Sequence, residues 1–342
     1  MKTIQAVKNT HHVLAMTMVL AGAASPAFAM SPPMMSVQVS PNSAITGLGA
    51  TTRDGVGVNL ATRYSERSER QSGTSKVANP GNEKTQSQQT TLLLDYRITD
   101  DLTGILAIPH INNTSSYDSP GGRVTQTTKG LGDVTVYGKY SLYKIDEAHE
   151  FLGFGGLKLP TASINKGDAS GVFPITQQAG SGSRDFIIGG AVSWGALYGD
   201  VSYKINGKES YQFGNSLALN AGVNYAIPST EQLSLVGEIN AESAARDKSD
   251  LAGPGVLPGG EVRDTGADKI YFTPGIQWRP AKDWSLAFKA QVPVYQSVQG
   301  IQLASKTNYT LGVSYHFGGS DAAMKHKDMG MEHKEMEVKK GM

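Results

Sequence analysis

The sequence of 342 residues contains no cysteine. This absence excludes disulfide bonds, cysteine nucleophiles, thiolate metal sites and iron–sulfur clusters. An excess of one charge is also lacking, because 31 Lys and Arg residues are balanced by 30 Asp and Glu residues. Nucleic-acid binding needs a basic surface, so we expect no nucleic-acid partner.

Long apolar runs are missing as well. Beyond the N-terminal segment no run approaches the roughly eighteen apolar residues of a transmembrane helix. The N-terminal segment itself combines Lys2 and Lys8 with an apolar run over 13–24 and the triplet Ala27-Phe28-Ala29. These are the features of a secretory signal peptide with its cleavage site. We therefore expect the protein to be exported.

What is present is alternation of apolar and polar residues. In residues 308–317, large apolar residues occupy every second position and small or polar residues occupy the others. A period of two predicts strands with one apolar and one polar face. Such segments number twelve, at 55–68, 86–98, 102–114, 130–144, 148–160, 183–195, 197–207, 213–227, 232–245, 268–279, 283–297 and 306–317.

The connections between these segments alternate in length. Short turns fall at 99–101, 145–147, 195–196, 228–231 and 280–282, and long polar loops fall at 69–85, 115–129, 161–182 and 246–267. Short turns on one rim and long loops on the other are typical of outer-membrane barrels, in which the short turns face the periplasm. A soluble β-sandwich is the alternative, since its strands also alternate.

We therefore predict an all-β fold, a transmembrane antiparallel up-and-down β-barrel of twelve strands. It would lie in the outer membrane of a Gram-negative bacterium, with outer-membrane lipid as its surroundings. The expected division is a signal peptide at 1–29, a periplasmic lead-in at 30–53, the barrel at 54–317 and a periplasmic tail at 318–342.

One stretch is similar to a known family. Residues 130–143 read GLGDVTVYGKYSLY, a glycine pair and an aspartate followed by an alternating strand with tyrosines. This resembles the outer-membrane transporter family named after the meta-pathway of phenol degradation. The resemblance implies a β-barrel that passes small, often hydrophobic or aromatic compounds, and it brings no catalytic residues. The chain departs from the common barrel ending, because a tail follows Phe317.

The polar strand faces predict the residues that line the lumen. Charged residues of both signs occur there: Arg63, Asp95, Arg97, Asp133, Lys139, Lys158, Asp185, Asp200, Lys204, Glu238, Glu242, Arg279 and Lys289. This near balance predicts weak charge selectivity, or a lumen partly filled by salt-bridged side chains. Twelve strands leave room for small solutes at most. We expect a polar, wet channel for a small-molecule solute, with a non-conducting structural or interaction barrel and a porin for aromatic compounds as alternatives.

Methionine is absent from residues 36–323, although the chain contains eleven. The tail repeats His326-Lys327-Asp328-Met329 as His333-Lys334-Glu335-Met336. Thioether and imidazole are ligands that suit Cu(I) or Ag(I). The predicted metal ligands are Met324, His326, Met329, Met331, His333 and Met336, with Met34 and Met35 as further candidates.

This tail predicts no required cofactor, only bound copper-like ions or a periplasmic metal-handling protein as a partner. An inert solvated tail and a partner-docking helix are the alternatives. Catalysis is not expected, because the region 30–317 contains three histidines, His110, His149 and His316, without a recognised nucleophile spacing.

Overall fold

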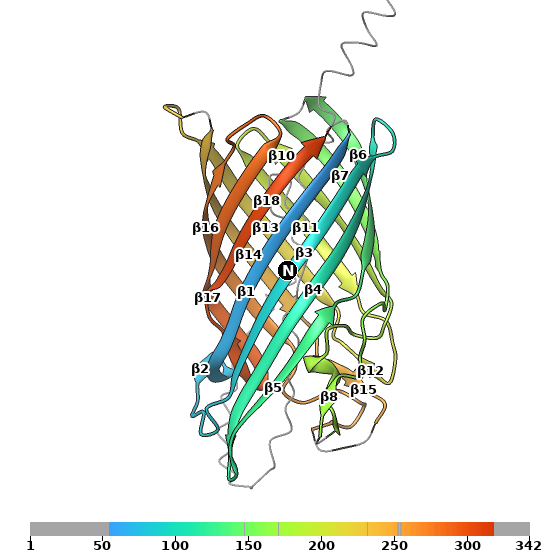
Figure 1. Ribbon diagram of the computed structural model, residues 1–342, viewed down its shortest axis with the longest axis vertical. Helices are drawn as coiled ribbons and strands as arrows, with labels where there is room; N and C mark the ends of the chain where they lie inside the picture. Colours follow the sequence, from blue (N-terminus) through green and yellow to red (C-terminus); the bar gives the residue numbers. More distant parts are fainter. Residues whose placement is uncertain are drawn as a thin grey trace, which may run out of the picture.

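The computed structural model describes residues 55–146, 148–169, 171–230, 232–251, 253 and 255–317. Within these residues the chain forms one closed antiparallel barrel of twelve long strands (Figure 1), as predicted. The long strands are β1 (Val56–Gly73), β3 (Lys84–Arg97), β4 (Leu102–Ser119), β6 (Thr135–Asp146), β7 (His149–Lys158), β10 (Asp185–Trp194), β11 (Leu197–Ile205), β13 (Ser216–Ala226), β14 (Leu233–Ala244), β16 (Ala267–Trp278), β17 (Trp284–Ser305) and β18 (Asn308–Phe317).

Shorter elements lie toward the long-loop rim. They are β2 (Ser75–Lys76), β5 (Gly122–Leu131), β8 (Gly167–Asp168), β9 (Gly171–Val172), β12 (Tyr211–Gln212), β15 (Lys248–Ser249) and the 3-10 helix η1 (Ile175–Gln177). No helix in the described ranges has the length and apolar character needed to cross a membrane.

Pairing of the first and last strands closes the barrel. β1 and β18 pair in register from Val56 with Phe317 to Tyr64 with Tyr309. Closure leaves no exposed sheet edge, which is what a sheet in hydrocarbon requires. Since the chain enters the barrel at Val56 and leaves it at Phe317, both described ends lie at the short-turn rim.

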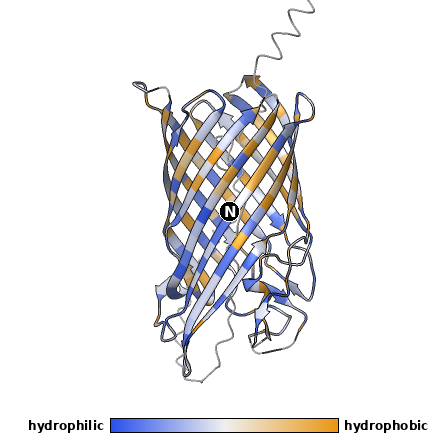
Figure 2. Cartoon of the chain, in the orientation of Figure 1, coloured by the Kyte–Doolittle hydropathy of each residue, from blue (hydrophilic) through white to orange (hydrophobic). Residues whose placement is uncertain are grey.

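The outer face of the barrel is apolar. Leu60, Leu219 and Leu311 are each about half exposed, while their sequence neighbours turn inward. Figure 2 shows that apolar residues are concentrated toward the short-turn rim, whereas the long-loop end is mainly hydrophilic. The strands therefore continue beyond the apolar band on the long-loop side. Exposed Tyr96, Trp194 and further aromatics at the short-turn ends form an interfacial girdle.

Several strand boundaries differ from the prediction. Residues 115–129, expected to be a loop, form most of a long hairpin in which β4 pairs with β5. The expected strand 130–144 is interrupted, because β5 ends at Leu131 and β6 begins at Thr135. β17 also runs past the expected residue 297, and it includes a turn at Gly300, whose φ of 82° favours glycine.

Leu311 provides a test of the lipid-facing surface. It lies on the outer face of β18, four residues before Tyr315, which is at the short-turn end of that strand. We expect Leu311→Arg to lower the free energy of unfolding by about 2–4 kcal/mol, the cost of a cation near the bilayer midplane. The control Leu311→Ile keeps an apolar group of similar volume and should change it by less than about 1.5 kcal/mol. Urea unfolding in lipid vesicles measures both, and equal stabilities for the two variants would contradict a membrane-facing Leu311.

Candidate channel lumen

Contacts that skip a strand identify the inner face of the barrel. Arg63 of β1 donates from Nη2 to Oε1 of Gln291 on β17 at 2.6 Å, although β18 lies between these strands. Lys289 of β17 reaches Oε1 of Glu238 on β14 at 2.6 Å across β16. Such contacts are possible only through the interior, so the side chains involved point into the lumen.

These residues belong to a connected polar network. Asn220 donates to Asp200 at 2.7 Å, and Asn240 donates to Asn220 at 3.0 Å. The other members of the network are Tyr198, Glu238, Thr273, Lys289, Gln291, Asn308 and Arg63. The polar network thus runs along seven strands from β11 to β1. Each member satisfies buried polar atoms of its neighbours, which is what a low-dielectric interior requires.

The facing wall also contains an apolar cluster, which the prediction of a polar inner surface did not include. Buried inward residues of β3, β4, β6, β7 and β10 form a hydrophobic cluster: Leu93, Ile105, Ala107, Tyr137, Leu152, Phe154 and Ala191. We call this cluster the apolar belt. The sequence does carry its signal, because the continuous apolar runs 92–94 and 105–108 are typical of strands that are apolar on both faces.

The side chains of these two walls are almost completely buried. Leu93 and Leu152 of the apolar belt are each 2% exposed, and Asn240 of the polar network is 0% exposed. Side chains inside a wide aqueous pore would be in contact with solvent. The described wall therefore has a narrow, two-sided interior here, apolar on one side and hydrogen-bonding on the other.

A cavity of about 180 Å³ lies nearer the long-loop rim, and we call it the vestibule. Its wall includes Pro109 and Ile111 of β4 and Lys269 of β16, and part of its lining comes from the loop between β7 and β10. This loop, residues 159–184, is named the inner loop. An apolar cavity of about 150 Å³ holds benzene, so the vestibule suits a molecule of one ring or a little more.

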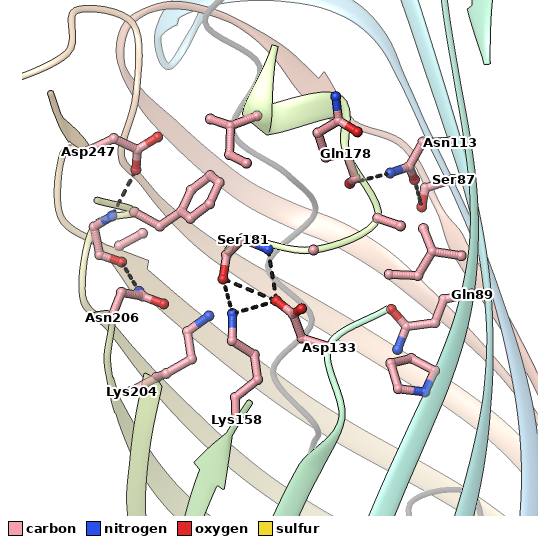
Figure 3. Close-up of a pocket in the computed structure, with 18 of the residues that line it drawn as sticks. Ser87, Gln89, Asn113, Asp133, Lys158, Gln178, Ser181, Lys204, Asn206 and Asp247 are labelled. Carbon is pink, nitrogen blue, oxygen red and sulfur yellow. Dashed lines mark hydrogen bonds and ion pairs between the residues drawn. The ribbon is translucent and has the colours of Figure 1, made fainter. Parts of the chain in front are cut away.

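Ion pairs surround the vestibule (Figure 3). Lys158 lies 2.6 Å from Asp185 Oδ2 and 3.2 Å from Asp133 Oδ2, and Lys204 lies 4.0 Å from Asp185 Oδ2. Asp247, on the loop between β14 and β16, accepts hydrogen bonds from the Tyr211 hydroxyl and the Gly214 N–H. Burial raises the pKa of the Asp247 carboxyl above its ordinary value, and these two donors oppose that effect.

The structure places the predicted lumen residues in three groups. Arg63, Asp200, Glu238 and Lys289 are members of the polar network. Asp133, Lys158 and Lys204 line the vestibule, and Asp185 pairs with Lys158 without lining it. Asp95, Lys139 and Glu242 point inward elsewhere: Asp95 accepts from Asn59 at 3.2 Å, and Lys139 and Glu242 are buried.

Arg97 and Arg279 lie at the short-turn rim. Arg97 is the last residue of β3, and it donates to the Thr99 and Asp100 carbonyls of the first short turn. Arg279 follows the end of β16 and donates to Oε1 of the buried Gln277 at 3.3 Å.

Three inward charged residues were missed by the sequence analysis. Arg67 and Lys269 line the vestibule, and Glu150 is fully buried in β7. Each lies an even number of residues from an inward neighbour of its own strand: Arg67 from Arg63, Lys269 from Thr273, and Glu150 from Lys158. Strict use of the period of two would have identified them.

The candidate metal ligands Met324, His326, Met329, Met331, His333 and Met336, together with Met34 and Met35, lie outside the described residues. Within the part of the chain that the structure describes, no group of three or more histidine, aspartate and glutamate residues is arranged to hold a metal ion.

The closed barrel with an apolar outer face, and with polar and apolar residues on its inner face, is that of an outer-membrane β-barrel protein. A solved structure with this fold is an outer membrane channel from Pseudomonas putida F1, which is 16% identical, covers 78% of this chain and 97% of its own, and has a TM-score of 0.57. Weaker similarity extends to the translocator domain of the autotransporter NalP from Neisseria meningitidis (11% identity, 80% and 92% coverage, TM-score 0.41) and to a Pseudomonas aeruginosa FadL homologue (10%, 78% and 91%, 0.39).

Residues 68–311 match the family described as "Putative MetA-pathway of phenol degradation". The chain belongs to this family, as the GLGD stretch indicated. No curated protein sequence matches it significantly. The protein lies in the outer membrane of a Gram-negative bacterium.

The Lys289–Glu238 pair is a testable part of the polar network, because both side chains are almost completely buried. We expect Lys289→Met to lower the free energy of unfolding by about 3–5 kcal/mol, since it leaves the Glu238 carboxylate without its cation. The double variant Lys289→Met with Glu238→Gln should recover most of that loss. A double-mutant cycle by urea unfolding measures this. A single variant as stable as the parent protein would contradict the buried pair.

Proposed function

We propose that the protein is a channel for small solutes that carry an apolar face and hydrogen-bonding groups, such as monocyclic aromatic alcohols. The observation that supports this most is the two-sided interior, in which the apolar belt faces the polar network. A solute with two chemically different sides would contact both walls at once. The vestibule volume suits a single ring as well.

Selectivity by charge should be weak. The inward cations are matched by anions, as in Lys289 with Glu238 and Lys158 with Asp185. A ring of one charge sign, which gives strong ion selectivity, does not occur among the described lumen residues. Neutral solutes should therefore pass at least as readily as ions.

The near-complete burial of the two walls favours a second candidate, a non-conducting structural barrel. For a solute to pass, the buried side chains of the apolar belt must change rotamer. Conductance in planar lipid bilayers separates the candidates. Discrete conductance steps support the channel, and a silent bilayer containing folded protein supports the structural barrel.

Leu152 tests the role of the apolar belt in selection. We expect Leu152→Asn to lower the uptake of phenol into proteoliposomes about three- to tenfold, while uptake of glycerol changes little. The loss of contact with one or two methylenes costs about 0.8 kcal/mol each, and 1.4 kcal/mol corresponds to tenfold. The control Leu152→Ile retains an apolar wall and should keep parent-level phenol uptake. Equal losses for phenol and glycerol would argue against selection by the apolar belt.

The tail supports a further part of the proposal, capture of Cu(I) or Ag(I) at the periplasmic rim. The support comes from the repeated His and Met pairs in the sequence, and from the pairing of Val56 with Phe317, which starts both terminal segments at one place. Soft thioether and imidazole ligands suit these ions in a chain without thiols. The metal would be handled there or passed to a periplasmic partner.

Copper binding is checked with the purified full-length protein in detergent, using competition for Cu(I) with a colorimetric chelator. We expect alanine at His326, Met329, His333 and Met336 to weaken binding at least about tenfold, which is about 1.4 kcal/mol. Alanine at Lys327 and Lys334, in the same repeat, is the matched control and should leave binding unchanged. Parent protein that binds Cu(I) no tighter than free methionine does would end this part of the proposal.

A further inference from the structure

The strand interruption in the GLGD stretch has a local structural role. β4 pairs with β5 through residues 110–119 and with β6 through residues 102–107, so β5 and β6 follow one another along the same edge of β4. Between them, residues 132–134 leave the ladder, although the Gly132 N–H still donates to the Pro109 carbonyl at 2.8 Å. The interruption places the Asp133 side chain at the vestibule.

The Asp133 carboxylate accepts hydrogen bonds from three donors of the inner loop. The Ala162 N–H donates to Oδ1 at 3.1 Å, and the Ser181 N–H and hydroxyl donate to Oδ2 at 2.8 and 3.2 Å. Lys158 adds an ion pair at 3.2 Å, and its ammonium also donates to the Ser181 hydroxyl. Asp133 is 7% exposed. One buried carboxylate thus holds both the early and the late part of the inner loop.

Close packing of glycines accompanies this contact. A Cβ at Gly180 would overlap with the Asp133 carboxylate and with the Ala162 side chain. A Cβ at Gly132 would crowd Ile111, Pro109 and the Ala179 carbonyl. Gly130, two residues earlier in β5, has open space around the same position. The sites of close approach are therefore specific to the inner loop and the Asp133 region.

The middle of the inner loop is held more weakly, from β4. Asn113 Nδ2 lies 3.5 Å from the Gln177 carbonyl and 3.4 Å from the Gln178 carbonyl, and the Ser87 hydroxyl donates to Asn113 Oδ1 at 2.6 Å (Figure 3). The two bonds from Asn113 to the inner loop are long and uncharged. Hydrogen bonds to a carboxylate are roughly twice as strong as neutral ones, so Asp133 holds the late part of the inner loop more strongly than Asn113 holds its middle. The early part is also bonded through Thr161 to Gly132 and Val134.

We propose that Asp133 is the positioning residue that holds the inner loop inside the vestibule and thereby sets the size of solute that enters the channel. The second half of this inference rests on the proposed transport function. Loss of the carboxylate leaves the Ala162 and Ser181 N–H groups without their acceptor, which is unfavourable for buried groups, and it removes one of the two anions beside Lys158. The inner loop then moves toward solvent, where water satisfies these groups.

Loop position is tested without any transport measurement. Because the chain has no cysteine, Ala179→Cys introduces a single thiol on a loop residue that is 6% exposed. Intact cells are treated with a membrane-impermeant maleimide. We expect Asp133→Asn and Asp133→Ala to raise the labelling rate of this thiol at least about tenfold. Asp118→Asn is the matched control, because Asp118 pairs with Arg123 on the exposed β4–β5 hairpin and does not contact the inner loop.

Gly180→Ala displaces the loop by steric overlap and retains the carboxylate, so it should also raise labelling, whereas Gly130→Ala should not. Heat-modified migration on gels verifies that each variant folds. Labelling rates that stay at the parent level in folded Asp133→Asn and Gly180→Ala proteins would overturn the positioning role.

Solute size is tested by swelling of proteoliposomes in a series of sugars. We expect the Asp133→Asn protein to admit larger sugars than the parent, with a conductance at least about twice as high. If the Asp133 variants label faster, but neither they nor the parent protein conduct in planar bilayers, the loop role is supported and the transport function is contradicted. Conducting parent protein with unchanged labelling and unchanged size limit would overturn this inference alone.

Discussion

The need to pair every backbone N–H and C=O group in a medium without water determines this architecture. Hydrocarbon offers no hydrogen-bond partner, so a spanning sheet has to close on itself. The pairing of Val56 with Phe317 at one end of the seam and of Tyr64 with Tyr309 at the other meets that need. Closure also separates two environments, and the period of two then directs apolar residues to lipid and the others to the interior.

The interior follows from the number of strands. Twelve strands leave a space between that of a filled barrel and that of an aqueous porin, and this chain fills much of it from two chemically different sides. On one side the polar network pairs most of its own donors and acceptors, and on the other the apolar belt carries a single polar side-chain group, the Tyr137 hydroxyl. The inner loop occupies part of the remaining space, nearer the long-loop rim. The free width of the interior is therefore set by side chains and one loop more than by the backbone cylinder.

Much of the fold was predictable from the sequence, because a two-residue period and alternating loop lengths are local features. Strand count, closure and the short-turn rim followed from them. The inner surface was only partly predictable: Asp200 and Glu238 point inward as the period requires, but Leu93 and Ile105 also do so, and a rule that sends every apolar residue to lipid fails there. The inward fold of the inner loop depends on Asp133 contacts with residues far along the chain, which no periodicity reveals.

The seam between β1 and β18 bears on how the barrel is made. Its two strands are the first and the last to leave the ribosome, and contacts of such long sequence separation form late in folding. Until the final strand arrives, the edge of β1 offers a row of unpaired amides to any neighbouring chain. Truncation of even the last strand should therefore leave an aggregation-prone open sheet.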